Sequence, residues 1–292
     1  MSSLLESLVD ALARGELVPC LGPGALAGVV DRERGEPIPA DSDSLILALN
    51  GGRPMSRRLM WEFSRAAMNV ELKRGRGAVQ RFLDATYAGR PWTQAPLHAW
   101  LAGTAPGYVI DLNRDLQLQH LYAERPHVLV RGIARVGGTD YRFRIHVHDG
   151  SGYREVDQDA VDPALPVLFK PLGSPEPGST YIASDADFVD YLTELMGGFA
   201  IPAFVKARRR GLRYLLLGLN LDRDTERMLV TELIHAAGSP AGWALIPDPT
   251  PRARRFCARQ GITIVEAGVD ELLEGLAYFD DEACATAGAL GC

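Results

Sequence analysis

The stretch Tyr214-Leu215-Leu216-Leu217-Gly218-Leu219 is the most apolar strand-like segment of the sequence. Nearly continuous hydrophobicity is typical of a parallel strand that is buried on both faces of a sheet. Further strand-like segments lie at 17–21, 107–110, 166–170, 243–246 and 262–265, and helical patterns separate most of them. Such alternation predicts the α/β class, with a doubly wound, Rossmann-like parallel sheet and right-handed crossovers.

Two segments are predicted to be insertions into this sheet. Residues 45–103 carry apolar residues at helical spacing and predict a helical block. Residues 127–156 alternate with a period of two around the turn signal Asp149-Gly150, which predicts a β-hairpin. We expect a single domain over residues 1–279 and a flexible tail of small residues at 280–292.

Composition narrows the class of protein. The 292 residues are 47% hydrophobic with a net charge of −6, which favours a soluble globular protein and argues against a general nucleic-acid binder. No apolar stretch reaches the roughly 20 residues that span a bilayer, and no secretory signal precedes the first helix. The four cysteines form no Cys-x-x-Cys pair, so we expect free thiols in a reducing cytoplasm, with a metal role for Cys284 and Cys292 left open.

Glycine and polar residues follow several predicted strands at the point where each strand ends. Gly22-Pro23-Gly24 follows the first strand, and Asp111-Leu112-Asn113-Arg114-Asp115 follows the second. The stretch Pro166-Val167-Leu168-Phe169-Lys170-Pro171-Leu172-Gly173-Ser174 runs from a third strand into a loop. In open α/β sheets ligands bind beyond the carboxyl ends of strands, so these loops predict one crevice. Tight turns and helix capping by Asn113 and Asp115 are the structural alternatives.

The order of these loops resembles the sirtuin-like family, in particular its zinc-free prokaryotic branch, whose better-known members hydrolyse NAD. The resemblance covers roughly residues 4–279 and rests on the segments 17–24, 109–115, 169–174, 184–191 and 217–224. It implies cleavage of the bond between nicotinamide and ribose, with Asn113 holding ribose and water and Asp115 behind it. NAD or ADP-ribose is the implied cofactor, and no metal is implied. The implied cofactor contacts are Gly22, Pro23, Gly24, Asn113, Gly173, Ser174, Gly218 and Asn220.

The sequence departs from the family pattern at the residues that carry the chemistry. Leu172 stands where the pattern Lys-Leu-His-Gly-Ser has its catalytic histidine, and leucine cannot accept a proton. Losing a general base typically costs about 10² to 10⁴ in rate. Pro23 replaces the alanine of Gly-Ala-Gly and removes a backbone N–H from a loop expected to face phosphates. Asp111 would add negative charge near a pyrophosphate if it faces the crevice.

These departures favour a non-hydrolytic accessory protein that binds a protein partner and retains some nucleotide binding. The Lys-Pro-Leu-Gly-Ser-Pro form of the loop resembles a subgroup associated with nitrogen-fixation gene neighbourhoods, which implies a nitrogenase component or assembly factor as partner. Self-association into a homo-oligomer stays open. The alternative is an NAD hydrolase, of the kind used in phage defence, in which another base replaces the histidine. His146 or His148, which share one face of the predicted hairpin, would serve if the hairpin folds over the crevice; a two-histidine metal site and a solvent-facing edge are the other interpretations of this pair.

Overall fold

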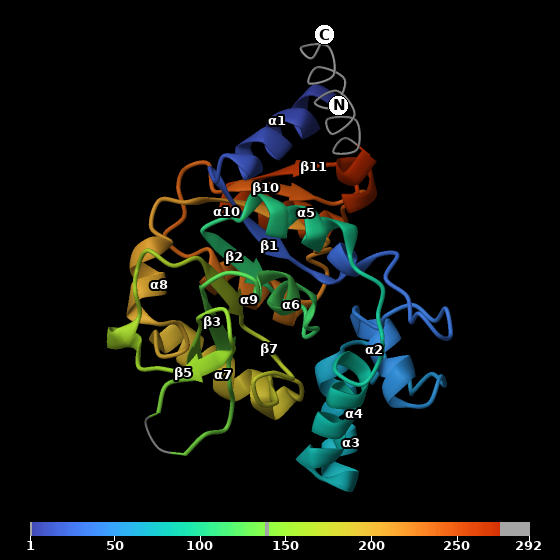
Figure 1. Cartoon of the computed structure of the whole chain (residues 1–292). Helices are drawn as coiled ribbons and strands as arrows, with labels where there is room; N and C mark the ends of the chain where they lie inside the picture. The colour runs from blue at the N-terminus through green and yellow to red at the C-terminus, as the bar shows by residue number, and fades with distance from the viewer. Residues whose placement is uncertain (1, 138–139, 275–292) are drawn as a thin grey trace.

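The computed structural model describes residues 2–137 and 140–274 and has one large sheet between two layers of helices (Figure 1). Nine strands form this sheet in the order β11-β10-β9-β1-β2-β6-β3-β4-β5. Their bounds are Leu17–Leu21 (β1), Tyr108–Asp111 (β2), His127–Gly132 (β3), Phe143–His148 (β4), Tyr153–Glu155 (β5), Val167–Lys170 (β6), Arg213–Leu217 (β9), Gly242–Leu245 (β10) and Ile262–Val265 (β11). All pairs from β11 to β3 are parallel, which confirms the predicted Rossmann-like class.

Helices cover both faces of the sheet because side chains alternate along each strand. Leu215 and Leu217 of β9 pack in one apolar cluster, and Tyr214 and Leu216 pack in the other. The first face carries α1 (Ser2–Ala13), α5 (Pro96–Thr104) and α6 (Gln117–Tyr122); the second carries α7 (Asp185–Gly197), α8 (Ala203–Arg208), α9 (Asp224–Leu233) and α10 (Pro251–Gln260). No helix in the described part of the chain has the length and apolar character needed to cross a bilayer.

The helical block contains α2 (Ser42–Leu49), α3 (Phe63–Arg74) and α4 (Arg76–Tyr87), and it lies to one side of the sheet (Figure 1). It has an apolar cluster of its own, to which Ile46, Ala66 and Leu83 contribute one buried side chain from each helix. α5 falls within the predicted 45–103 insertion, but its Leu97 and Leu101 pack against the sheet. The independent helical block therefore ends before α5.

The predicted hairpin at 127–156 is an extension of the main sheet. β3 pairs in parallel with β6 on one side and antiparallel with β4 on the other, and β4 pairs antiparallel with β5. β5 thus forms one edge of the sheet, and β11 forms the opposite edge. A separate two-stranded hairpin, β7 (Gly173–Ser174) and β8 (Thr180–Tyr181), forms the loop that follows β6.

Candidate functional site

The sheet reverses its strand order at β1. From β1 the chain proceeds to β2 on one side, and it later returns to place β9 on the other side. Such a switch point is where open α/β sheets bind ligands. A cavity of about 1070 Å³ lies there, at the upper end of the range for ligand pockets. It is lined by residues from the loops after β1, β9, β10 and β11 and from α2, α9 and α10.

The predicted cofactor-binding residues divide into two groups. Pro23, Gly24, Gly218 and Asn220 line the cavity, at the ends of β1 and β9. Gly22, Asn113, Gly173 and Ser174 are not among the residues that line it. The glycine loops after β1 and β9 therefore line the cavity, whereas the predicted site residues that follow β2 and β6 do not.

The glycine loops after β1 and β9 bind each other. The N–H of Gly22 donates to the Leu217 carbonyl at 2.8 Å, and the N–H of Gly24 donates to the Gly218 carbonyl at 2.9 Å. Ala25 donates to the carbonyl of Gly22, and Pro23 has no N–H to offer. The backbone donors of this turn are thus committed within the protein, so a phosphate would need other donors.

Two arginines on α10 are the available cations of the cavity. Arg252 and Arg255 line it, both are exposed, and neither side chain bonds to a described residue. They lie in the first turns of α10, where Thr250 caps the helix by accepting from the Ala253 N–H and where no acidic residue is present. A helix N-terminus favours an anion. This end of the cavity is therefore its most favourable position for a phosphate group.

A third arginine of the cavity is already engaged. The guanidinium of Arg223 donates to the backbone carbonyl of Trp61 and lies over its ring at 5.5 Å from the centroid. It also lies 3.3 Å from a carboxylate oxygen of Asp43 at the start of α2. Arg223 therefore connects the helical block to the loop after β9 and is less free to bind a ligand.

Glu226 lines the cavity and has a strongly shifted pKa. It is half-buried on α9 and accepts a hydrogen bond from the Leu221 N–H at 2.5 Å. Burial, reinforced by the nearby Asp222 carboxylate, raises the pKa of Glu226 to about 7. A carboxyl group that titrates near neutrality in a cleft has the property of a general acid or base. Sequence reasoning missed this residue, since only burial distinguishes it from other glutamates.

Glu226→Gln should flatten the pH dependence of stability. The folded protein holds this proton more tightly than the unfolded chain, where glutamate titrates near its usual 4.5. Its contribution to stability is therefore complete below about pH 4.5 and is lost as the pH rises through about 7, by on the order of 2 kcal/mol. Urea unfolding of both proteins at about pH 5 and about pH 8 measures the difference. Glu124→Gln, which removes an exposed carboxylate, is the control; equal slopes for Glu226→Gln and the wild type would contradict the assignment.

Asn113 and Asp115 have structural contacts in this fold. The Asn113 side-chain amide donates to the Gly22 carbonyl at 2.9 Å, and the residue is buried. Asp115 accepts from the Gln117 N–H at the start of α6, at 2.8 Å, while its second carboxylate oxygen has no partner among the described residues. The N-cap of α6 is Leu116 and no side chain caps this helix, so the capping alternative does not account for the Asn113 contact with Gly22. Neither Asn113 nor Asp115 lies on the cavity wall.

A fully buried ion pair joins the ends of β2 and β6. Nζ of Lys170 lies 2.5 Å from Oδ2 of Asp111, and both side chains have no exposed surface. The other oxygen of Asp111 accepts from the Asn113 N–H at 2.9 Å. The negative charge of Asp111 is therefore balanced inside the protein and does not reach the cavity.

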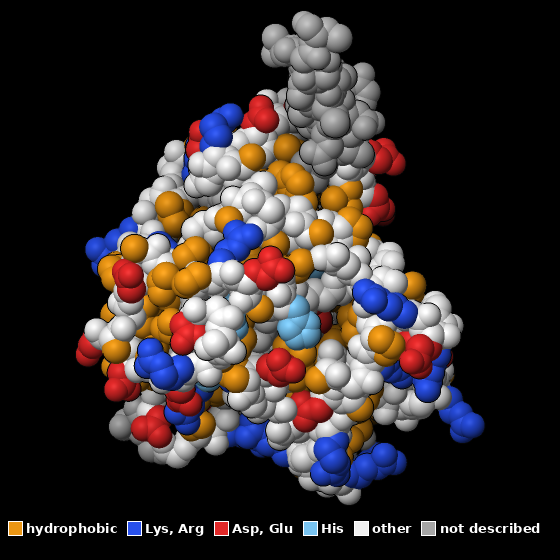
Figure 2. Space-filling model, in the orientation of Figure 1, with side chains coloured by type: hydrophobic (Ala, Val, Ile, Leu, Met, Phe, Trp, Pro, Cys, Tyr) orange, Lys and Arg blue, Asp and Glu red, His pale blue; other side chains and the backbone are white. Residues whose placement is uncertain are grey.

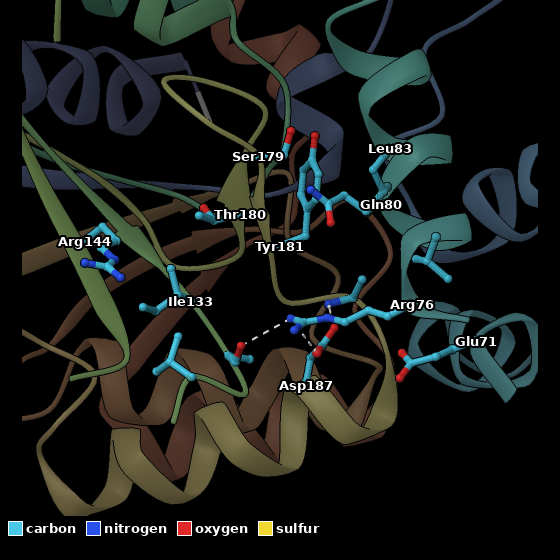
Figure 3. A pocket seen from close by; sticks show the side chains of 14 residues that line it. Glu71, Arg76, Gln80, Leu83, Ile133, Arg144, Ser179, Thr180, Tyr181 and Asp187 are labelled. Atoms are coloured by element: carbon cyan, nitrogen blue, oxygen red, sulfur yellow. Dashed lines mark hydrogen bonds and ion pairs between the residues drawn. The ribbon is translucent and has the colours of Figure 1, made fainter. Parts of the chain in front are cut away.

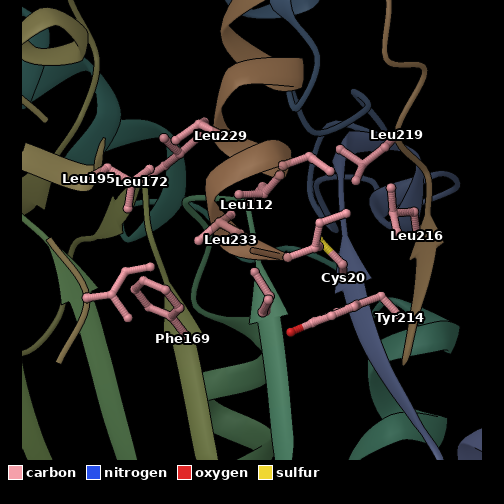
Figure 4. Close-up of a cluster of buried hydrophobic side chains, with 14 of the residues drawn as sticks. Cys20, Leu112, Phe169, Leu172, Leu195, Tyr214, Leu216, Leu219, Leu229 and Leu233 are labelled. Carbon is pink, nitrogen blue, oxygen red and sulfur yellow. The ribbon is translucent and has the colours of Figure 1, made fainter. Parts of the chain in front are cut away.

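Leu172 is a core residue. It is 7% exposed and belongs to the apolar cluster on the α7–α10 face of the sheet, where Leu195 and Leu229 lie near it (Figure 4). Its carbonyl accepts from the Ile182 N–H across the loop. Gly173 and Ser174 pair with β8, and the buried Arg131 donates to the Ser174 carbonyl at 3.1 Å. At the position where the family pattern has its catalytic histidine, this protein thus has a leucine that packs in the hydrophobic core.

His146 and His148 share a face of β4, as expected, but the expectation that this face meets solvent is wrong. They are 5% and 6% exposed because Tyr153 on β5 and His127 on β3 pack against that face. Three strand spacings separate β4 from β2, or about 14 Å, so these rings do not lie at the end of β2. Burial lowers the pKa of His146 to about 4.

No group of three or more potential ligands for a metal is found in residues 2–137 and 140–274, and Cys284 and Cys292 lie outside the described residues.

A second cavity, of about 210 Å³, lies between the helical block and the sheet. Arg76 and Gln80 approach it from α4, and Ile133 and Arg144 approach it from the sheet (Figure 3). Asp187 on α7 binds Arg76 at 3.1 Å and Arg135 at 2.8 Å, and Arg135 binds Glu71 at 2.6 Å. This network fixes α3 and α4 against α7.

No protein-family model matches the chain, and no curated protein matches it. The chemistry of the site must therefore be argued from its own residues.

Proposed function

We propose that the chain is a nucleotide-binding accessory protein that does not hydrolyse NAD. The observation that carries the proposal is the contrast between the two halves of the predicted crevice. The half at β1 and β9 contains a large cavity with two unengaged arginines. The half at β2 and β6, which the sirtuin-like resemblance assigns to catalysis, is occupied by internal contacts of Asn113 and Leu172.

The cavity is large enough for NAD or ADP-ribose. Its favourable charge for a pyrophosphate is confined to the two arginines of α10, since five acidic residues also line it: Asp41, Asp43, Asp222, Glu226 and Asp270. Arg252 and Arg255 would hold the pyrophosphate, since the N–H groups of the glycine turn already donate to carbonyls of the protein. Gly24 and Gly218 let the loops after β1 and β9 approach each other closely, since a Cβ on either residue would meet the backbone of the other loop within 2.7 Å. Asn220 is exposed and lines the cavity. A protein partner, for which the resemblance suggests a nitrogenase component or assembly factor, would then respond to the nucleotide-bound form.

One observation supports NAD hydrolysis as the second candidate. Glu226 lines the cavity and has a pKa raised to about 7, so it can accept a proton from water near neutral pH. In this alternative Glu226 would act as the general base, the role that the family pattern gives to the histidine at the position of Leu172. Its carboxylate accepts from the Leu221 N–H, which would hold it in a fixed orientation.

Calorimetric titration with NAD and with ADP-ribose tests the proposal. We expect both to bind, and we expect Arg252→Gln/Arg255→Gln to weaken binding by about tenfold or more, because each charge-assisted hydrogen bond contributes roughly 1.5–3 kcal/mol. Arg254→Gln/Arg259→Gln removes the same charge from the same helix at positions that do not line the cavity, and it should bind like the wild type.

Nicotinamide release distinguishes the two candidates. The accessory protein should release none above background from NAD. Turnover that Glu226→Gln abolishes would establish the hydrolase in its place. Failure of both nucleotides to bind at millimolar concentration would refute the proposal and leave the cavity to another ligand.

A further inference from the structure

The helical block differs sharply in charge from the rest of the protein. Residues 53–90 contain nine lysine and arginine side chains and three acidic ones, a formal charge of +6 in a chain whose net charge is −6. Figure 2 shows lysine and arginine side chains gathered at the outer end of this block, at the lower right of the view. The average charge of the chain conceals this segregation.

The three acidic residues of the block are turned toward the protein interior. Glu62 accepts from the Thr225 hydroxyl at 2.6 Å, and Glu71 is bound to Arg135. Asp84 accepts from the hydroxyls of Ser179 and Tyr181, at 2.6 and 2.8 Å. None of the three is left to neutralise the outer surface.

Most of the cations of the block point outward without partners. Arg76 and Arg90 form ion pairs. The other seven are exposed, and none of their side chains forms an ion pair or hydrogen bond with a described residue: Arg53, Arg57, Arg58, Arg65, Lys73, Arg74 and Arg81. We call these seven the basic surface. Unpaired like charges repel one another, so the surface is most stable when an anion covers it.

We propose that the basic surface binds the phosphodiester backbone of a nucleic acid. Arginine dominates the surface, and its planar guanidinium matches phosphate geometry. α3 has 12 residues and is about 18 Å long, which corresponds to about five phosphates of one strand at 3.4 Å spacing. The proposal does not depend on the cavity or on its ligand.

A protein partner is the less favoured occupant. The centre of a protein interface is depleted of charge and enriched in apolar side chains. Within the block the exposed large apolar residues are Leu72 and Trp61, 77% and 45% exposed, and charged residues surround both. The proposal matches the cations of the basic surface to phosphates, and phosphate contacts position a protein without reading sequence. The binding is therefore expected to be independent of sequence.

Fluorescence anisotropy with a labelled DNA duplex of about 25 base pairs, and with a single strand of the same length, tests the proposal between about 50 and 200 mM salt. For the duplex we expect log K to fall against log salt concentration with a slope of about −4 to −6. Arg57→Gln/Arg58→Gln/Lys73→Gln/Arg74→Gln should reduce that slope by about 3 to 4 and weaken binding at low salt by tenfold or more, since each lost phosphate contact contributes about 0.9.

Arg154→Gln/Arg210→Gln is the control, because it removes two exposed and unpartnered cations outside the block. It should bind like the wild type, and far-ultraviolet circular dichroism should show that both variants remain folded. Wild-type binding no tighter than that of the fourfold variant would overturn the proposal. So would binding of polyglutamate, with the same dependence on the four residues, by a protein that does not bind either DNA, since the surface would then serve an acidic protein.

Discussion

Lys170→Met should destabilise the protein by about 3–5 kcal/mol, because it leaves the Asp111 carboxylate buried without its cation. Both side chains are fully enclosed at the ends of adjacent strands, so water cannot replace the missing charge. Asp111 also fixes the backbone of Asn113, and the end of β2 should loosen with it. Urea unfolding at neutral pH measures the loss as a shift of the midpoint.

The double variant Asp111→Asn/Lys170→Met distinguishes the missing charge from the lost packing. Asparagine keeps an acceptor for the Asn113 N–H and carries no charge, so the double variant should recover to within about 1–2 kcal/mol of the wild type. Arg144→Met breaks the Arg144–Glu155 pair, which has the same type of contact at 2.7 Å but is half exposed. It should cost less than about 1 kcal/mol. Equal losses for Lys170→Met and Arg144→Met would show that burial does not amplify this ion pair.

The sequence predicts the sheet well because hydrophobic patterning determines it. Four consecutive residues from Tyr214 to Leu217 are fully buried, as an apolar run without alternation requires. Within the predicted helical block, Gly75 separates α3 from α4 with a positive φ of 79°. These features depend on local spacing, which can be counted along the chain.

The site is less predictable because its contacts join distant residues. Lys170 and Asp111 are 59 positions apart, and only the parallel register of β2 and β6 brings their charges together. The alternation in β4 correctly places His146 and His148 on one face. Whether Tyr153 and His127 cover that face depends on strand pairing, which the alternation does not specify.

The net charge of a sequence does not show how its charges are distributed over the surface of the folded protein. A net charge of −6 argues against nucleic-acid binding only if the charges are mixed over the surface. The excess of arginine at 53–90 can be counted from the sequence. That Glu62, Glu71 and Asp84 turn inward becomes evident only from their partners in α9, in the residue Arg135 and in the loop before α7.

Gly218→Ala should have the second large effect, on the cavity as well as on stability. Gly218 has a φ of +72°, and a Cβ placed there would lie 2.4 Å from the Ala25 nitrogen and 2.6 Å from the Gly24 carbonyl carbon. Backbone atoms cannot move aside as a flexible side chain can. The two glycine loops should therefore separate and lose the hydrogen bond from Gly24 to Gly218, and the wall of the cavity formed by these residues should shift.

Gly211→Ala isolates the steric part of this effect. Gly211 has the same φ of +72°, but a Cβ there meets no atom within 4 Å. The left-handed conformation alone costs alanine roughly 1–2 kcal/mol, so Gly211→Ala should lose about that much. Gly218→Ala should lose at least about twice as much, because it adds a clash of the new Cβ with the facing backbone to the same conformational cost.

Urea unfolding compares the stabilities of the two variants, and titration with ADP-ribose should show weakened binding for Gly218→Ala alone. Equal stability losses would mean that the loops can separate at little cost, and the close approach of β1 and β9 would then not be what shapes the cavity.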